Sequence, residues 1–119
     1  MDKLLYLVDD TDSILTIAAS ILENDYRVLT MTSAEKMFTL LPKKRPDMIL
    51  LDIEMPDTNG FEAIAGLKGD PDWKDIPVMF LTGYIDDALL AKASESNAAG
   101  VINKSEMKDI LLSRVKDII

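Results

Sequence analysis

The chain alternates between short apolar runs and longer segments in which apolar residues recur every three or four positions. Four of the runs end at side chains that can take part in chemistry: Asp9 and Asp10 after 4–8, Asp52 after 48–51, Thr82 after 78–81, and Lys104 after 100–103. Runs that are apolar throughout are typical of strands covered on both faces, as in parallel sheets. The pattern therefore predicts a parallel sheet whose strands end in reactive groups.

The repeat of strands and helices predicts a doubly wound α/β fold. Expected strands cover 4–8, 26–30, 48–52, 77–81 and 101–103, and expected helices lie near 14–22, 34–41, 61–67, 86–96 and 106–118. We interpret Thr32-Ser33-Ala34-Glu35 as a capping box, and residues 55–60 as a turn in which Gly or Asn can take positive φ. Right-handed crossovers favour a five-stranded parallel sheet of order 2-1-3-4-5, the flavodoxin-like order, with five flanking helices.

In this order the first and third strands are neighbours at the point where strand order reverses, which places Asp9, Asp10 and Asp52 side by side. Ligands of open α/β sheets bind at that carboxyl edge. At an effective dielectric near 20, each close carboxylate pair costs about 4 kcal/mol at ~4 Å. The cluster therefore requires a cation, and oxygen-only ligands favour Mg²⁺, with Mn²⁺ or Ca²⁺ as substitutes.

Composition narrows the chemistry that this edge can perform. A chain of 119 residues, 48% hydrophobic and 29% charged, is expected to form one ordinary globular domain. The absence of cysteine and histidine excludes disulfides, thiol catalysis, thiolate metal sites and imidazole bases. A net charge of −8 disfavours direct binding of nucleic acid. The sequence shows no signal peptide and no membrane-spanning run, so we expect a cytoplasmic protein without membrane contact.

The remaining reactive groups fit phosphoryl transfer. An ionised carboxylate can attack a phosphoryl group without a general base. Asp52 is the best nucleophile, because its strand lies between the acidic pair and Thr82. Lys104 and a bound cation can neutralise the phosphoryl oxygens, and the hydroxyl of Thr82 can donate a hydrogen bond to a third oxygen.

Four motifs in order give the chain a resemblance to the receiver domain of two-component response regulators. They are Leu-Val-Asp-Asp at 7–10, Leu-Asp-Ile-Glu-Met-Pro-Asp-Thr-Asn-Gly-Phe-Glu at 51–62, Pro-Val-Met-Phe-Leu-Thr-Gly at 77–83, and Lys104. The resemblance covers residues 1–119, which implies a single receiver domain and no output domain within this sequence.

The resemblance also implies roles for the acidic residues. Asp52 would accept a phosphoryl group from the phosphohistidine of a sensor histidine kinase or a phosphotransfer protein. Asp10 would bind Mg²⁺ directly and Asp9 largely through water, with Asp52 and the backbone carbonyl of Glu54 as further ligands.

Thr82 and Lys104 would hold the phosphoryl oxygens, and hydrolysis of the acyl phosphate would reset the domain. Self-phosphorylation and autodephosphorylation, without substrate turnover, are then the expected activities. The face made by the fourth helix, fifth strand and fifth helix would change on phosphorylation. It would bind a downstream protein or an output domain on a longer chain.

Two positions depart from the usual receiver pattern. Ser105 follows Lys104 where receivers have proline after a cis peptide, and Val101 stands where the fifth strand usually carries an aromatic switch residue. A cis bond without proline costs about 2.5–4 kcal/mol, and whether this bond is cis or trans stays open. Glu54 and Tyr84 are candidates for tuning the access of water or phosphodonor. The alternatives are a solvent-facing charge for Glu54 and a cover over the fourth helix for Tyr84.

Three other interpretations stay open. A pseudo-receiver, which binds proteins without being phosphorylated, is consistent with the departures at Ser105 and Val101. A haloacid-dehalogenase-like phosphatase would use Asp10 as its nucleophile, because Asp10-Thr11-Asp12 superficially resembles the paired aspartates of that class. Finally, Asp9 and Asp10 could cap the first helix, where acidic groups are favourable.

Overall fold

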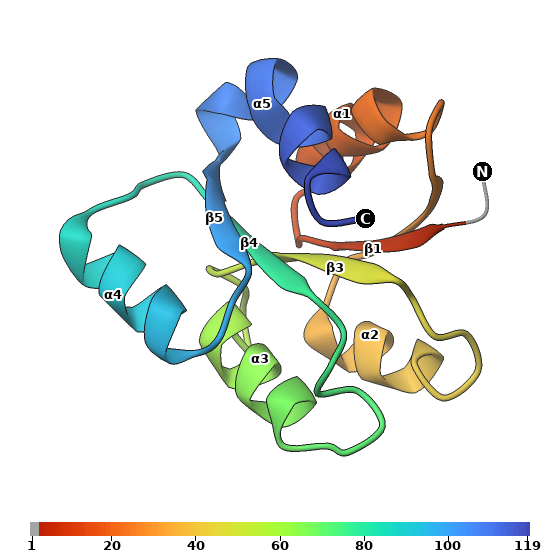
Figure 1. Ribbon diagram of the computed structural model, residues 1–119, viewed down its shortest axis with the longest axis vertical. Helices are drawn as coiled ribbons and strands as arrows, with labels where there is room; N and C mark the ends of the chain where they lie inside the picture. The colour runs from red at the N-terminus through yellow and green to blue at the C-terminus, as the bar shows by residue number, and fades with distance from the viewer. Residues whose placement is uncertain (1–2) are drawn as a thin grey trace.

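The computed structural model describes residues 3–119, which form a five-stranded parallel sheet of order β2-β1-β3-β4-β5 (Figure 1). The strands are β1 (Leu4–Val8), β2 (Arg27–Met31), β3 (Met48–Asp52), β4 (Val78–Thr82) and β5 (Gly100–Asn103). The helices are α1 (Asp12–Leu22), α2 (Ala34–Leu40), α3 (Gly60–Lys68), α4 (Asp87–Glu95), the short 3₁₀ helix η1 (Lys104–Glu106) and α5 (Met107–Lys116). The predicted fold class and strand order are confirmed.

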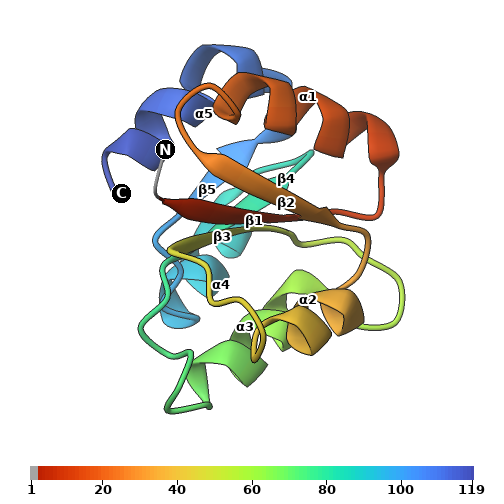
Figure 2. The ribbon, with the colours of Figure 1, turned by 90° about the vertical axis from the view of Figure 1, so that its right-hand side faces the viewer.

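Helices cover both faces of the sheet. In both ribbon views α1 and α5 lie on one face, and α2, α3 and α4 lie on the other (Figures 1 and 2). Successive strand residues alternate between the two layers, so that Leu5 and Leu7 pack with α1 and α5 while Tyr6 and Val8 pack on the opposite side. Every residue of β1, β3 and β4 is buried, which explains why these strands are apolar up to Asp52 and Thr82 at their carboxyl ends.

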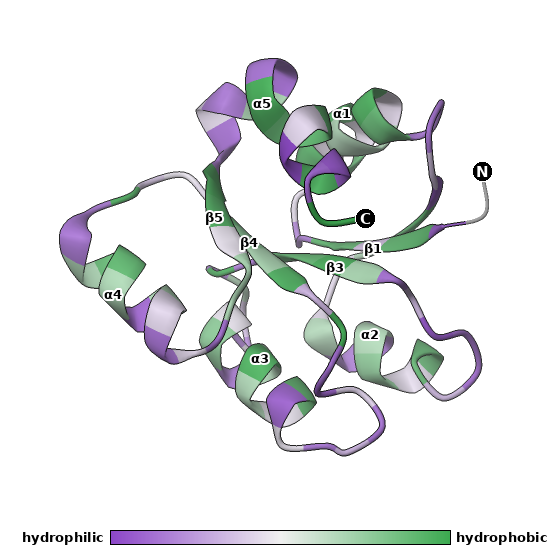
Figure 3. Ribbon diagram, viewed as in Figure 1, coloured by the Kyte–Doolittle hydropathy of each residue, from purple (hydrophilic) through white to green (hydrophobic). Residues whose placement is uncertain are grey.

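Figure 3 shows the apolar residues concentrated in the strands and on the helix faces that meet them. This distribution is the one that a sheet covered on both faces requires. Within residues 3–119, none of the helices has the length and apolar content that crossing a membrane would need.

The capping box predicted for the second helix is wrong by one residue. The N-cap is Ser33 rather than Thr32, and the Ser33 hydroxyl accepts from the backbone N–H of Lys36 at 3.2 Å. Because the helix begins at Ala34, its third residue is Lys36. A lysine side chain has no acceptor for the backbone N–H of the N-cap residue, so no reciprocal hydrogen bond forms. A reciprocal capping box occurs instead at α3. There Asn59 Oδ1 accepts from the N–H of Glu62 at 2.9 Å, and Glu62 Oε1 accepts from the N–H of Asn59 at 3.1 Å.

The predicted turn at residues 55–60 has its positive φ at Asp57 (φ 67°) and not at Asn59 or Gly60, the two residues expected to be able to adopt it. Asn59 is extended because it caps α3, and Gly60 is already helical. Aspartate tolerates the left-handed region because its short polar side chain can bond locally. Gly60 is required for a different reason. A Cβ at this position would lie 2.6 Å from the carbonyl oxygen of Asp52 and 2.8 Å from Cα of Ile53.

We expect Gly60→Ala to lower the free energy of unfolding by about 2 kcal/mol, because the added methyl meets backbone atoms at the end of β3. Urea-induced unfolding followed by circular dichroism measures the change. Gly83→Ala is the matched control, since a Cβ there has no heavy atom within 4 Å, and its stability should stay within about 0.5 kcal/mol of the wild type. Equal stability of the two variants would contradict this explanation of Gly60.

Candidate functional site

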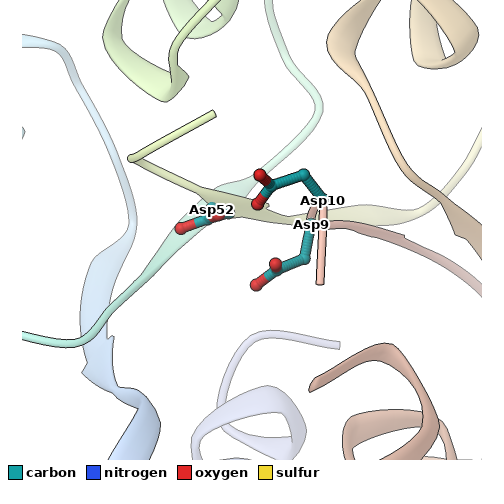
Figure 4. A group of neighbouring side chains, drawn as sticks. All are labelled: Asp9, Asp10 and Asp52. Carbon is teal, nitrogen blue, oxygen red and sulfur yellow. The ribbon is translucent and has the colours of Figure 1, made fainter. Parts of the chain in front are cut away.

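Three carboxylates meet where β1 and β3 end. Asp9 and Asp10 follow β1, Asp52 is the last residue of β3, and the two strands are paired, with Val8 opposite Leu51. One carboxylate oxygen from each aspartate lies within 4.8 Å of the others. Figure 4 shows Asp9 and Asp10 leaving the chain on opposite sides, with Asp52 beside them. The structure therefore brings together the three acidic residues that the strand ends single out.

The cluster contains its own cation. Asp9 and Asp52 are buried, with 0% and 1% of their surface exposed, whereas Asp10 faces solvent. The ammonium of Lys104 lies 2.8 Å from Oδ2 of Asp9 and 3.1 Å from Oδ1 of Asp52. Buried charges are tolerated when they are paired, so Lys104 is what allows two carboxylates to be buried side by side.

Neither acidic residue after β1 is the N-cap of α1. That position belongs to Thr11, whose side chain makes no capping hydrogen bond. Oδ1 of Asp9 instead accepts from the backbone N–H of Thr11 at 2.9 Å, which fixes the carboxylate at the end of β1. The other oxygen of Asp9 is thereby directed at Lys104.

The environment of Asp52 raises its pKa from 3.8 to about 6. Burial is the main cause, and the negative charge of Asp9 adds to it. Two hydrogen bonds to Oδ1 of Asp52 lower the pKa in part. One comes from the ammonium of Lys104, and the other comes from the backbone N–H of Glu54 at 3.2 Å. Burial lowers the pKa of Lys104, but its bonds to Asp9 and Asp52 outweigh burial, so the net direction is upward.

The other predicted site residues occupy the same edge of the sheet. Thr82 ends β4, next to the pair formed by Asp52 and Leu81, and is buried. Its hydroxyl donates to the carbonyl of Tyr84 at 3.1 Å, within its own loop. The side chain of Tyr84 is 68% exposed, and Glu54 is also exposed. In this conformation the Thr82 hydroxyl is bonded to its loop, and the Glu54 backbone bonds to Asp52.

Asn103 is a residue of this edge that the sequence interpretation missed. Its Oδ1 accepts from both the backbone N–H and the hydroxyl of Ser105, at 2.9 and 2.8 Å. Within residues 3–119 no peptide bond is cis, so the Lys104–Ser105 bond is trans. An asparagine two residues before a serine at a strand end is the signal of an Asx turn that could have revealed this contact. Val101 is half-buried and packs on the α2–α4 side.

The donor set fits a divalent cation. Within residues 3–119, Oδ2 of Asp9 is buried without a hydrogen bond of good geometry, and the Lys104 ammonium contacts it as an ion pair. One ammonium therefore serves two buried carboxylates, while Asp10 adds a third at the solvent side. A cluster of oxygen donors with an excess of negative charge is the kind of site that Mg²⁺, Mn²⁺ or Ca²⁺ occupies.

Known proteins share this fold and this sequence pattern. The transcriptional regulatory protein AfsQ1 of Streptomyces coelicolor is 30% identical over 116 residues, which are 97% of this chain and 50% of that protein. The structure of the BeF3-activated receiver domain of DrrB has a TM-score of 0.89 and 28% identity, covering 99% of this chain and 97% of that one. The Mn²⁺-bound response regulator Rcp1 has a TM-score of 0.79 and 25% identity, covering 98% and 88%.

The sheet order and the acidic cluster with its lysine define a flavodoxin-like α/β domain whose charged residues gather at its switch point. The family described as the response regulator receiver domain matches residues 5–116, and the chain belongs to that family. It is thus a receiver domain, consistent with phosphorelay signalling. The chain spans from 13% to 50% of the length of the first curated relatives that it matches.

Proposed function

We propose that this domain is a phosphoryl acceptor, in which Asp52 takes a phosphoryl group from the phosphohistidine of a sensor histidine kinase or phosphotransfer protein. The observation that carries the proposal is the Lys104 ammonium, held 2.8 Å from Asp9 and 3.1 Å from Asp52 beside a third carboxylate. Phosphoryl transfer needs positioned positive charge more than acid–base groups, which suits a chain without histidine.

In the proposed step a carboxylate oxygen of Asp52 forms a bond to phosphorus while the phosphorus–nitrogen bond of the donor breaks. The electron pair of that bond leaves with the imidazole. Without a bound cation the pKa of Asp52 is about 6, so the carboxyl is already mostly ionised at pH 7. It is therefore ready to attack, and it is more basic than an aspartate in water.

We propose that Asp9, Asp10, Asp52 and the backbone carbonyl of Glu54 hold Mg²⁺, with Mn²⁺ or Ca²⁺ able to replace it. The bound cation supplies positive charge to the phosphoryl oxygens. The Mn²⁺ in the Rcp1 structure supports this assignment by similarity. Lys104 provides a second positive charge beside the carboxylates of Asp9 and Asp52.

Thr82 and Lys104 would hold the phosphoryl oxygens of the product. The Thr82 hydroxyl now donates to Tyr84, so binding phosphoryl requires it to leave that carbonyl and releases a hydrogen bond in the loop before α4. Of the nine residues of α4, Ala93 alone is buried, so few apolar contacts hold the helix in place. We propose that this release shifts the face made by α4, β5 and α5. That face would bind a downstream protein or an output domain on a longer chain.

Phosphorylation is expected to change amide hydrogen exchange in residues 83–95 and along β5. The loop loses its Thr82–Tyr84 bond, and α4 is the least buried of the helices that would respond. Exchange measured by mass spectrometry with and without acetyl phosphate tests this. β1, which is buried throughout, serves as the internal reference. Identical exchange in α4 and β5 in both states would remove the switching part of the proposal.

Glu54 and Tyr84 are proposed to tune the lifetime of the acyl phosphate, because both side chains are exposed and each lies two residues beyond a site residue, Asp52 or Thr82. We expect Glu54→Ala and Tyr84→Ala to change the rate of autodephosphorylation by about threefold or more while leaving unfolding stability within about 0.5 kcal/mol. Loss of the mass of phosphate with time after removal of the donor measures the rate. If both variants lost phosphate at the wild-type rate, neither side chain would tune dephosphorylation.

Incubation with acetyl phosphate and Mg²⁺, followed by intact mass, tests the proposed function. The expected result is one added phosphate in the wild type, none without a divalent cation, and none in Asp52→Ala. An unmodified wild type would favour the pseudo-receiver interpretation, in which the domain acts only by binding proteins. Phosphate added to Asp52→Ala but not to Asp10→Ala would favour the phosphatase-like chemistry.

A further inference from the structure

Lys104 must reach a long way to make its two ion pairs. It follows β5, the edge strand, whereas Asp52 lies on β3 and Asp9 follows β1. The strand of Asp52 is thus two strands across the sheet from β5, and the strand before Asp9 is three strands across. A flexible four-carbon side chain spans such a gap only if its backbone is held in one place.

The backbone at Lys104 is held by a side chain on one flank and by a helix start on the other. Asn103 Oδ1 accepts from the N–H and the hydroxyl of Ser105, so two hydrogen bonds close around Lys104. The carbonyl of Lys104 accepts from the N–H of Met107. Asn103 itself pairs with Thr82 in the sheet, which ties this turn to the end of β4.

Packing anchors the residues that flank this turn, Ile102 and Met107, and not the turn itself. None of the three residues of η1 is buried, and Ser105 is exposed. Three-residue 3₁₀ helices have poor hydrogen-bond geometry of their own, so their conformation depends on external bonds. The bonds from Asn103 are therefore the side-chain restraint on where Lys104 begins.

We propose that Asn103 is a positioning residue, whose side chain fixes the η1 turn so that the Lys104 ammonium bridges Asp9 and Asp52. The inference rests on the proposed function. It accounts for a trans Lys104–Ser105 bond at this position, because the Asx turn sets the path of the chain through side-chain hydrogen bonds.

The proposal has a signature with two opposite effects. Loosening Lys104 removes a positive charge from two candidate metal ligands, so Asn103→Ala should bind Mg²⁺ about fivefold more tightly. The same variant should be phosphorylated by acetyl phosphate about tenfold more slowly at saturating Mg²⁺, because Lys104 no longer meets the phosphoryl group in position. A residue that only stabilised the fold would not tighten metal binding.

Isothermal titration with Mg²⁺ and the rate of phosphate addition by intact mass are measured for the wild type, Asn103→Ala and Asn103→Ser. The serine hydroxyl can accept the bond from Ser105 more weakly, so its values should fall between the other two. Asp70→Ala is the matched control. This variant loses a similar hydrogen bond, which Asp70 Oδ1 accepts from the N–H of Asp72 at 2.8 Å in the loop before β4. Its Mg²⁺ affinity and its rate of phosphate addition should equal those of the wild type.

Mg²⁺ affinity that is unchanged or weaker in Asn103→Ala would overturn the assignment, and so would the same tightening in Asp70→Ala. Failure of the proposed function looks different. In that case the wild type gains no phosphate from the donor, while the Mg²⁺ titrations still report whether Asn103 positions Lys104.

Discussion

Asp52→Asn is expected to raise the free energy of unfolding of the metal-free protein by about 2–3 kcal/mol at pH 7. The folded state raises the pKa of Asp52 from 3.8 to about 6, because burial and the charge of Asp9 disfavour ionisation. That gap corresponds to about 3 kcal/mol of stability, present at low pH and lost as the pH rises through the interval from 3.8 to about 6. Asparagine has nearly the same shape and no charge, so it avoids this loss.

Urea-induced unfolding from pH 4 to pH 8 in the presence of a chelator measures the effect. The difference between Asp52→Asn and the wild type should be largest above pH 6 and should shrink toward pH 4. Asp25→Asn is the control for loss of an exposed carboxylate, since Asp25 pairs with Lys116 at 3.4 Å on the surface, and its stability should change little. A less stable Asp52→Asn without metal would contradict a crowded carboxylate site.

Lys104→Ala is expected to have the opposite effect and to lower metal-free stability by about 3 kcal/mol at pH 7. The substitution leaves Asp9 and Asp52 buried without the ammonium that contacts both. The pKa of Lys104 is raised, so its ammonium stays charged throughout the neutral range. The pH dependence of the stability loss is therefore set by the ionisation of the carboxylates. The loss should therefore shrink as the pH falls and Asp52 takes up a proton.

Added Mg²⁺ should restore a large part of the stability of Lys104→Ala, because a divalent cation can replace the missing charge between the carboxylates. Chemical unfolding with and without Mg²⁺ measures this recovery. Lys116→Ala, which removes the exposed partner of Asp25, is the matched lysine control. If Lys104→Ala were no less stable than Lys116→Ala, the ammonium would not be the counter-charge of the cluster.

The strand order and the acidic site could be predicted because both follow from burial. Strands covered on two faces must be apolar until they leave the sheet, so the point where each run stops marks the carboxyl edge. The prediction that Asp9, Asp52 and Lys104 lie at the carboxyl ends of parallel strands is therefore confirmed by the sheet. Single-residue errors occur at the strand ends, where β2, β4 and β5 each differ by one residue from the expected bounds. β4 begins at Val78 because Pro77 has no N–H to donate to the ladder.

Loop hydrogen bonds could not be predicted in the same way. The spacing of hydrophobic residues does not specify the backbone conformation of loops. It therefore predicts neither the positive φ of Asp57 nor the two hydrogen bonds that Asn103 Oδ1 accepts from Ser105. The ion pair between Lys104 and Asp9 was also missed, because the reach of a side chain across three strands depends on how its turn is held. Local polar contacts of this kind set the geometry inside a site whose location the sequence already indicates.

The most direct test of the phosphoryl-acceptor role is to locate the modified residue. Protein treated with acetyl phosphate and Mg²⁺ is reduced with borohydride, which converts an aspartyl phosphate to homoserine, and the digested peptides are sequenced by mass spectrometry. The account predicts homoserine at position 52 and aspartate at positions 9 and 10. Homoserine at position 10, or at no position while the protein is folded and binds Mg²⁺, would contradict it.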